Sequence, residues 1–120
     1  MQNQTDSQAC KRSFKFHRLV NEPFYLKGKQ TIPQDNYYHE VLNSNIFEKT
    51  TTLYFDFVFP DGKSVPARFS DNHNSQGPYC EFQLRKSADT FKLRSFFEVG
   101  DKLESVVDFD TQTISARKLN

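Results

Sequence analysis

The sequence predicts a mainly antiparallel β domain with two short helices, arranged as a small barrel. Apolar and polar residues alternate through several short segments, which is the pattern of strands with one buried face. Turn residues separate these segments at short intervals, as they do in hairpins. The chain has 120 residues, among them 13 phenylalanines and no tryptophan. It is therefore expected to form one domain around one aromatic core.

The chain begins with a polar segment, residues 1–13, which is expected to be a flexible lead. The domain proper is expected to span residues 14–120. Phe14 and Phe16 alternate with polar residues, so residues 14–19 are predicted to form a strand.

A second short strand and then a helix are expected next. Phe24-Tyr25-Leu26 is interpreted as a brief strand after a break at Asn21-Glu22-Pro23. Pro33 favours a helix start, because its missing N–H is no loss in the first turn. Four residues at helical spacing predict an amphipathic helix over residues 34–43, namely Tyr37, Tyr38, Val41 and Leu42.

The clearest strand signal lies at residues 53–59 and is followed by a return strand. Pro60-Asp61-Gly62-Lys63 forms the turn between them, with glycine where positive φ is needed. Pro66 lies within the return strand, which indicates an edge or a bulge. The residues expected to face the core are Leu53, Phe55, Phe57, Phe59, Val65, Ala67 and Phe69.

A long polar loop, residues 70–78, is predicted between the return strand and another strand at residues 79–85. The loop has nine residues and no apolar anchor. A loop longer than the fold needs usually serves binding. The strand after it is expected to point Cys80, Phe82 and Leu84 inward, and Arg68, Tyr79, Gln83 and Arg85 are expected to face solvent.

The last part of the chain is predicted to hold a helix and a final hairpin. Ser87 is expected to cap a helix over residues 88–97. Residues 102–109 and 113–118 are predicted to be the two strands of the hairpin. The apolar residues assigned to these elements are Ala88, Phe91, Phe96, Phe97, Leu103, Val107, Phe109, Ile114 and Ala116.

Charge is balanced overall but unevenly distributed along the chain. The net charge is +1, yet residues 11–30 hold six basic residues and one acidic residue. Residues 98–110 hold five acidic residues and one basic residue. Two interpretations stay open: a basic face and an acidic face, if the segments lie apart in space, or an ordinary mixed surface.

Cysteine content and hydropathy indicate a cytoplasmic protein that does not contact membranes. Cys10 and Cys80 are too few for a disulfide framework, and Cys80 is expected to be a buried free thiol. Mean hydropathy is −0.75. No apolar run approaches the roughly 20 residues of a membrane span, and the amino terminus has no signal-peptide pattern.

Enzyme chemistry is not indicated by the residue patterns. His17, His39 and His73 fall on different predicted elements, and neither a zinc-helix spacing nor a C-x-x-C pair occurs. Asp56 and Glu81 would suit a metal-dependent nuclease only if they converged, but alternation places each alone on a solvent-facing position. Glycine-rich phosphate loops are also absent. No catalytic residue, metal site or cofactor is therefore expected.

The order of these elements resembles that of a known family of DNA-binding pseudobarrels. The motifs that match are Thr31-Ile32-Pro33, Pro60-Asp61-Gly62-Lys63, Arg68, residues 79–86, Phe96-Phe97 and Val99-Gly100-Asp101. Over residues 14–118 the chain resembles the B-three domains of plant transcription factors. It is still more similar to the DNA-recognition (effector) domains of bacterial restriction endonucleases. The resemblance implies a seven-stranded open pseudobarrel.

In that family, two arms hold DNA in the major groove. The resemblance places the amino-terminal arm at residues 21–30 and the carboxyl-terminal arm at residues 68–76, with Tyr79 and Arg85 at its base. Asn, Gln and Arg side chains can read base edges, and lysines can hold phosphates. The expected DNA-binding residues are Lys27, Lys29, Gln30, Arg68, Ser70, Asn72, His73, Asn74, Gln76, Tyr79, Arg85 and Lys86.

The predicted function is sequence-specific binding of double-stranded DNA, as the recognition or effector domain of a restriction endonuclease. Nuclease activity would then lie in another domain or chain. Two alternatives stay open. One is a small barrel for single-stranded nucleic acid, with bases stacked on Tyr25, Tyr54 and Tyr79. The other is a barrel that binds a protein or a carbohydrate, although the lack of tryptophan weakens the carbohydrate reading.

Overall fold

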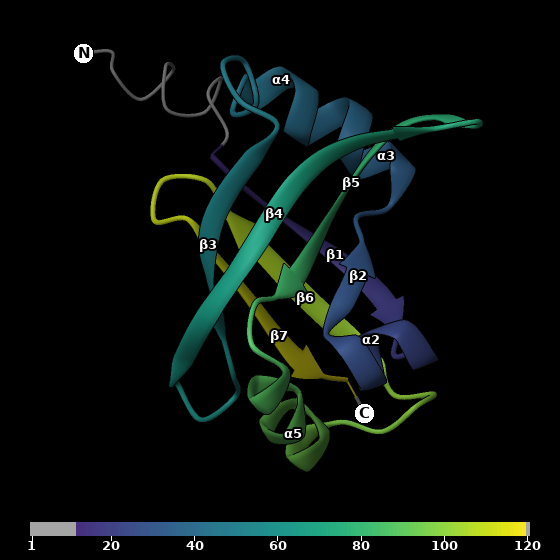
Figure 1. The fold of residues 1–120 in the computed structure, drawn as a ribbon, viewed down its shortest axis with the longest axis vertical. Helices are drawn as coiled ribbons and strands as arrows, with labels where there is room; N and C mark the ends of the chain where they lie inside the picture. The colour runs from purple at the N-terminus through teal and green to yellow at the C-terminus, as the bar shows by residue number, and fades with distance from the viewer. Residues whose placement is uncertain (1–11, 120) are drawn as a thin grey trace.

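A computed structural model describes residues 12–119, in which seven strands form one sheet that curls into an open half-barrel (Figure 1). The strand order is β1-β6-β7-β3-β4-β5-β2. Neighbours are antiparallel except β3 and β7, which are parallel. The predicted mainly β, seven-stranded open fold is confirmed. The strands are β1 (Ser13–Leu19), β2 (Lys29–Thr31), β3 (Thr52–Val58), β4 (Ser64–Asn74), β5 (Gly77–Leu84), β6 (Lys102–Asp108) and β7 (Thr113–Lys118).

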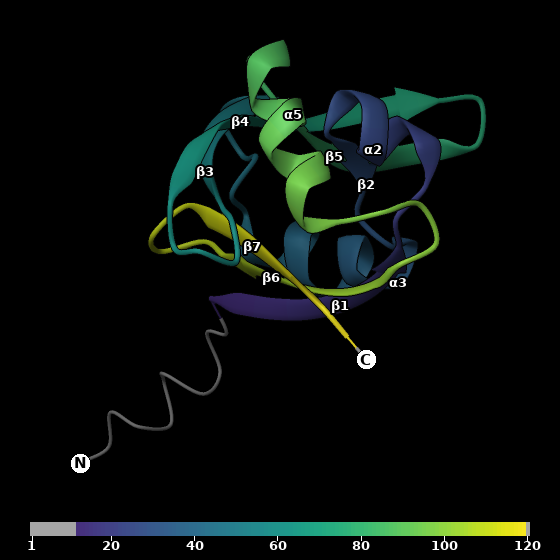
Figure 2. The ribbon, with the colours of Figure 1, turned by 90° about the horizontal axis from the view of Figure 1, so that it is seen from below.

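Short helices lie at the two ends of the half-barrel (Figures 1 and 2). Helices α3 (Gln34–Asn36) and α4 (Leu42–Ser44) are joined by a π-helical turn, η1 (Tyr37–Val41), into one stretch at the upper end in Figure 1. Helix α5 (Ser87–Phe96) covers the lower end. Both predicted helices are confirmed within one residue at each end. Among the described helices, none is long and apolar enough to cross a membrane.

The core is aromatic, as the composition indicated. Phe24 lies near its centre, and its ring centroid is 6.4 Å from that of Phe57 and 6.3 Å from those of Phe82 and Phe97. Full burial of one such ring contributes about 1.5–3 kcal/mol. Phe91 is the exception: its side chain is 69% exposed, with the Arg94 guanidinium over the ring. The buried phenylalanines are Phe14, Phe16, Phe24, Phe55, Phe57, Phe59, Phe69, Phe82, Phe97 and Phe109.

Helix α2 (Glu22–Lys27) occupies the segment predicted as a second short strand, so that prediction is wrong. Asn21 caps this helix, because its side-chain oxygen accepts a hydrogen bond from the Phe24 amide at 3.1 Å. Gly28 ends it with φ +64, and a Cβ there would lie 2.6 Å from Cγ of Leu84. The cap and the closing glycine override the strand-like run of apolar residues.

The predicted polar loop over residues 70–78 is mostly a β-hairpin, which corrects the sequence prediction. Asp71 pairs with Cys80 and Asn74 with Gly77, so only Ser75 and Gln76 lie in the turn. Side-chain oxygen Oδ1 of Asn74 accepts a hydrogen bond from the Gln76 amide at 2.8 Å and fixes this turn. Polar composition favours a loop, but backbone pairing between the two strands makes a strand of the same residues.

Ser87 does not cap α5, contrary to expectation. It is the first helical residue, and Lys86 takes the cap position without a side-chain hydrogen bond. The Ser87 carbonyl instead accepts a hydrogen bond from Oγ1 of Thr90 at 2.6 Å. The helix therefore begins one residue earlier than the capping pattern suggests.

The basic and acidic segments do not form separate faces. Strand β1 pairs with β6 along its whole length, so residues 13–19 of the basic segment lie beside the acidic segment. Nε of Arg12 is 2.8 Å from Oδ1 of Asp110, and Nε2 of His17 is 3.3 Å from Oε2 of Glu104. The mixed-surface interpretation therefore holds along this edge. The Cys80 thiol is free and buried, as predicted, and Cys10 lies outside the described residues.

Candidate nucleic-acid interface

The outer face of strands β3, β4, β5 and β2 carries cross-strand rows of polar side chains, which we call the polar face. Tyr54 pairs with Arg68, Arg68 with Gln83, and Gln83 with Lys29, so these four residues form one row. Alternate residues of a strand point to opposite faces. Further residues of the polar face along β4 and β5 are Ser70, Asn72, Asn74, Tyr79 and Glu81.

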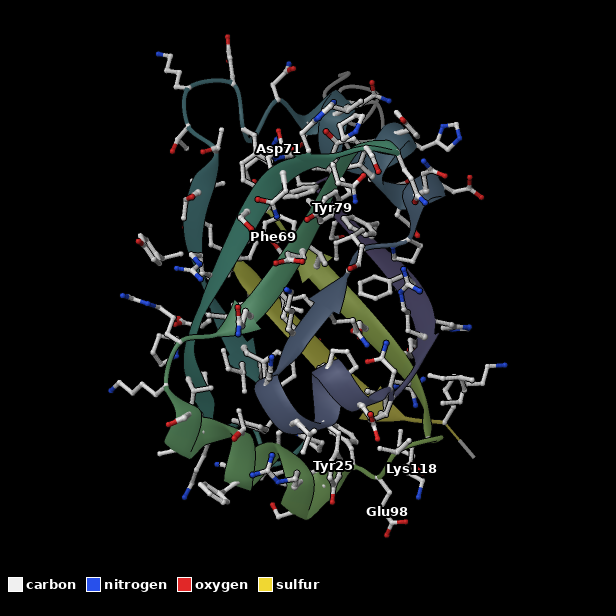
Figure 3. All side chains as sticks on the ribbon, turned by 45° about the vertical axis from the view of Figure 1, so that its right-hand side comes forward. Tyr25, Phe69, Asp71, Tyr79, Glu98 and Lys118 are labelled. Atoms are coloured by element: carbon white, nitrogen blue, oxygen red, sulfur yellow. The ribbon has the colours of Figure 1, made fainter. Side chains whose placement is uncertain are left out.

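The hairpin of β4 and β5 extends beyond the body of the half-barrel in both ribbon views (Figures 1 and 2). From Arg68 to Asn74 the polar face runs for about 20 Å along β4, at roughly 3.3 Å per residue. Figure 3 shows Asp71 and Tyr79 on neighbouring strands of this hairpin, above the core residue Phe69. The hairpin is thus a two-stranded ribbon that presents polar side chains away from the core.

A groove of about 430 Å³ lies between the end of this hairpin and the edge of the sheet at β2. Arg18, Lys29 and Thr31 line one side of it. The hairpin contributes Asn74, Gln76 and Tyr79. Residues from both expected arms therefore line one concave surface.

Arg18 places a fixed positive charge at this groove. Its Nε donates a hydrogen bond to the Thr31 carbonyl at 2.9 Å, which links β1 to β2, the two edge strands of the sheet. Burial lowers the pKa of the Arg18 guanidinium, but an arginine remains charged at neutral pH. The adjacent Lys29 is partly neutralised, because its Nζ lies 3.8 Å from Oε2 of Glu81.

The base of the hairpin is anchored by a hydrogen bond that the sequence did not reveal. The Tyr37 hydroxyl donates to Oδ1 of Asp71 at 2.9 Å, joining η1 to β4. Burial, together with this hydrogen bond, raises the pKa of Tyr37 to about 12. The two residues lie 34 positions apart, and no local pattern connects them.

The structure brings together only part of the predicted site. Lys29, Arg68, Ser70, Asn72, Asn74 and Tyr79 share the polar face, and Gln76 lies in the turn at the end of the hairpin. His73 pairs with Pro78 and lies on the opposite face of the hairpin. Arg85 stacks its guanidinium over Tyr54 with a separation of 4.7 Å from the ring centroid.

Three predicted site residues lie elsewhere. Gln30 pairs with Phe82 on the inner side of the sheet and is only 3% exposed, so it does not reach the polar face. Alternation along β2 explains this, since its neighbours point outward. Lys27 ends α2, and Lys86 precedes α5.

The residues considered for catalysis do not converge. Asp56 pairs with Pro66, whose carbonyl accepts a hydrogen bond from the Arg85 amide, whereas Glu81 lies four residues before Arg85. That offset is about 13 Å along the strand direction. Within residues 12–119, no group of three or more His, Cys, Asp and Glu side chains is placed to hold a metal ion.

Comparison with known proteins does not identify a function for the chain. No protein-family model matches the chain, and no curated protein matches it. The chemistry of the polar face therefore carries the functional assignment. That face offers amide donors and acceptors, exposed cations and the rings of Tyr54 and Tyr79, and Tyr79 lines the groove.

Proposed function

We propose that this chain binds double-stranded DNA with sequence preference, through the β4–β5 hairpin and the segment between β1 and β2. The groove lined by the hairpin and by Arg18 of β1 and Lys29 and Thr31 of β2, which flank that segment, is the observation that supports this most strongly. The major groove of B-DNA is about 12 Å wide and admits a two-stranded β ribbon. A polar face of about 20 Å matches roughly six base pairs at about 3.4 Å per pair.

Hydrogen bonds within the hairpin distinguish the two asparagines as base readers. Nδ2 of Asn72 donates to Oγ of Ser70 at 3.0 Å, which leaves one N–H and the side-chain oxygen for a base. Oδ1 of Asn74 is already bonded to the turn, so its amide retains chiefly donors. Asn72 can thus pair with both N6 and N7 of adenine, while Asn74 is better suited to donate to an acceptor.

Cations around the polar face suit the remaining contacts. Arg68 is exposed on β4 and can bind guanine through O6 and N7. Lys29 is exposed on the polar face, while Lys27 and Lys86 are exposed at helix ends outside it. Lysines chiefly hold phosphates. Phosphate contacts would set the orientation of the hairpin, and base contacts would set the sequence preference.

The proposal includes the resemblance to B-three-type pseudobarrels and a place within a restriction endonuclease. The open seven-stranded fold and the projecting hairpin are compatible with that family. A nuclease domain or a separate nuclease chain would be the catalytic partner. A reducing cytoplasm is the proposed location, since the buried Cys80 thiol is free.

Binding of single-stranded nucleic acid is the second candidate, favoured by the 56% exposure of Tyr54 and by Tyr79 at the groove. Stacked bases need a continuous platform of ring faces. Here the Arg85 guanidinium covers Tyr54, and the Arg94 guanidinium lies over Tyr25 on a different element. The tyrosines are therefore poorly placed to stack successive bases.

The test compares duplex and single-stranded oligonucleotides by fluorescence anisotropy at several salt concentrations. Duplex should bind more tightly, with a slope of log K against log salt near −4 to −5 if about five phosphates are contacted. Equal or tighter binding of single strands would favour the stacking surface. Absence of nucleic-acid binding at low salt would favour a protein or carbohydrate ligand.

A further inference from the structure

Three concavities of the surface meet at Arg18. The first is the groove at the end of the hairpin. The second, of about 660 Å³, lies where β1, α2 and β2 meet, and the third, of about 410 Å³, lies between the end of β1 and the start of β6. No hairpin residue lines the second or the third, which together we call the basic junction. Because Arg18 lines all three, one concave surface runs from the hairpin across Arg18 to α2 and β6.

Positive charge predominates at the basic junction. Arg18, Lys27, Lys29 and Lys102 line it, and Glu22 is the one carboxylate that does so among the described residues. Within residues 12–119, Lys27 and Lys102 take part in no ion pair. A concave surface lined chiefly by one sign of charge concentrates ions of the opposite sign. The basic junction therefore suits an anionic ligand.

Arg18 is held in a position that suits a phosphate. Its Nε donates to the Thr31 carbonyl at 2.9 Å, and its two terminal nitrogens have no partner in the part of the chain that the structure describes. The guanidinium is a planar fork that can bind two oxygens of one phosphate. Because the backbone carbonyl already orders this side chain, binding would cost little further conformational entropy.

Two exposed leucines favour a sugar–phosphate chain over a lone anion. Leu19 is 59% exposed and lines the third concavity, and Leu26 is 55% exposed and lines the second. An inorganic phosphate offers no apolar surface to a leucine, whereas deoxyribose presents carbon atoms between successive phosphates. Protein contacts to a DNA backbone commonly involve both the sugar and the phosphate. Leucines beside unpaired cations match that combination.

We propose that the basic junction binds backbone phosphates of duplex DNA beside the base pairs that the hairpin contacts, with Arg18 and Lys102 as phosphate-binding residues that the sequence did not indicate. This inference rests on the proposed binding of duplex DNA and extends it to a flanking stretch of the duplex. In Figure 1, α2 and the end of β1 lie below the projecting hairpin, on the same side of the molecule. One duplex can therefore contact both. Such contacts would fix the direction in which the hairpin lies on its site without reading bases.

The test uses duplexes in which single phosphates are replaced by uncharged methylphosphonates, one position at a time. Each duplex carries the motif that selection on the full chain yields, with flanking base pairs on both sides. Binding is measured by fluorescence anisotropy at low salt. Replacement of particular phosphates on one flank should weaken binding about three- to tenfold, the effect of losing one charged contact. Replacements on the other flank should have no effect.

Three substitutions assign these contacts to residues. Lys102→Ala and Lys27→Ala change exposed positions, and each should reduce the salt slope by about 0.9 and abolish the effect of one flanking methylphosphonate. Arg18→Gln removes the charge but keeps a donor for the Thr31 carbonyl, and it should abolish the effect of another. Lys49→Ala removes an exposed lysine outside the basic junction and should change neither quantity.

The inference is overturned, while the proposed function stands, if the duplex binds but no flanking methylphosphonate weakens it. It is equally overturned if Lys102→Ala, Lys27→Ala and Lys49→Ala behave alike. These comparisons use exposed lysines, so they decide the matter even if Arg18→Gln does not fold. Millimolar inorganic phosphate should displace the duplex no better than chloride at equal ionic strength, and stronger displacement would assign the basic junction to a free anion instead. Absence of any duplex binding would contradict the proposed function itself.

Discussion

Removal of the Tyr37 hydroxyl should loosen the hairpin on which the proposed DNA contacts depend. The hydroxyl donates to Oδ1 of Asp71 at 2.9 Å, and Tyr37 is only 2% exposed. Hydrogen bonds to charged groups contribute about 1.5–3 kcal/mol. Asp71 is half-buried and can bind water after the change, so we expect the lower value, about 1.5 kcal/mol.

The assay is thermal unfolding of Tyr37→Phe followed by circular dichroism. A loss of about 1.5 kcal/mol corresponds to a decrease of about 6 °C in Tm for a domain of this size. Tyr38→Phe is the matched control, because Tyr38 is 42% exposed and its hydroxyl has no hydrogen-bond partner among the described residues. Amide hydrogen exchange at residues 70–80 should also become faster in Tyr37→Phe alone.

The same contact predicts a dependence on alkaline pH. Because the pKa of Tyr37 is raised to about 12, its protonated form is favoured in the folded state. Its contribution is complete below about pH 10, the value for an unfolded tyrosine, and is lost as pH rises toward 12. Ultraviolet titration should show that Tyr37 ionises well above pH 10. Equal Tm values for the two variants, or ionisation of Tyr37 near pH 10, would refute the anchoring role of this hydroxyl.

Four further substitutions test the interface and the segment beside it. Asn72→Ala should reduce the base preference at one position of the DNA site by about 1–3 kcal/mol, and Asn74→Ala should reduce it less. Selection from random duplexes measures both effects. Equal effects would contradict the assignment of donors and acceptors to the two side chains. Lys29→Ala should weaken binding to all duplexes alike and reduce the salt slope by about 0.9, whereas a changed sequence preference would make it a base reader. Gly28→Ala should lower the free energy of unfolding by about 2–4 kcal/mol, because φ is +64 and the new Cβ would approach Leu84 to 2.6 Å. Urea unfolding measures this change, and near-native stability would contradict the close packing there.

The parts of the fold that the sequence predicted are those with local signals. Every odd-numbered residue from 53 to 59 is apolar, and Phe55, Phe57 and Phe59 are buried as expected. Gly62 takes φ +86 in the turn that follows, as its place in the Asp-Gly pair indicated. Strands β6 and β7 also match their predicted ranges within one residue. Period-two patterning and turn residues are sufficient where both are present.

The parts that the sequence did not predict depend on contacts between distant segments. Pairing of β4 with β5 extends to Asn74 although no apolar side chain marks that region. Asn21 and Pro23 mark the start of α2, but the sequence interpretation treated Asn21-Glu22-Pro23 only as a break before a short strand. Pairing of β1 with β6 brings Arg12 and His17 next to Asp110 and Glu104, although the charges look segregated along the chain.

The candidate site was predicted in part for the same reason. Arg68, Asn72 and Asn74 share a face because alternate residues of a strand point the same way. Their common face therefore follows from the sequence as soon as the segment is taken to be a strand. The inward position of Gln30 depends on the register of a three-residue strand with β5. Such a short strand has too few residues for a pattern, so the burial of Gln30 became evident only in the structure.

Selection of binding sites from a random duplex library on the immobilised chain tests the proposed function most directly. We expect enrichment of a motif of about six base pairs, in which each single-base change weakens binding by about 1–3 kcal/mol. The enriched duplex should stay intact when the chain is incubated with it and magnesium, since Asp56 and Glu81 do not converge. Absence of any enriched motif would contradict sequence-specific DNA binding, and cleavage by this chain alone would contradict a recognition domain without catalytic residues.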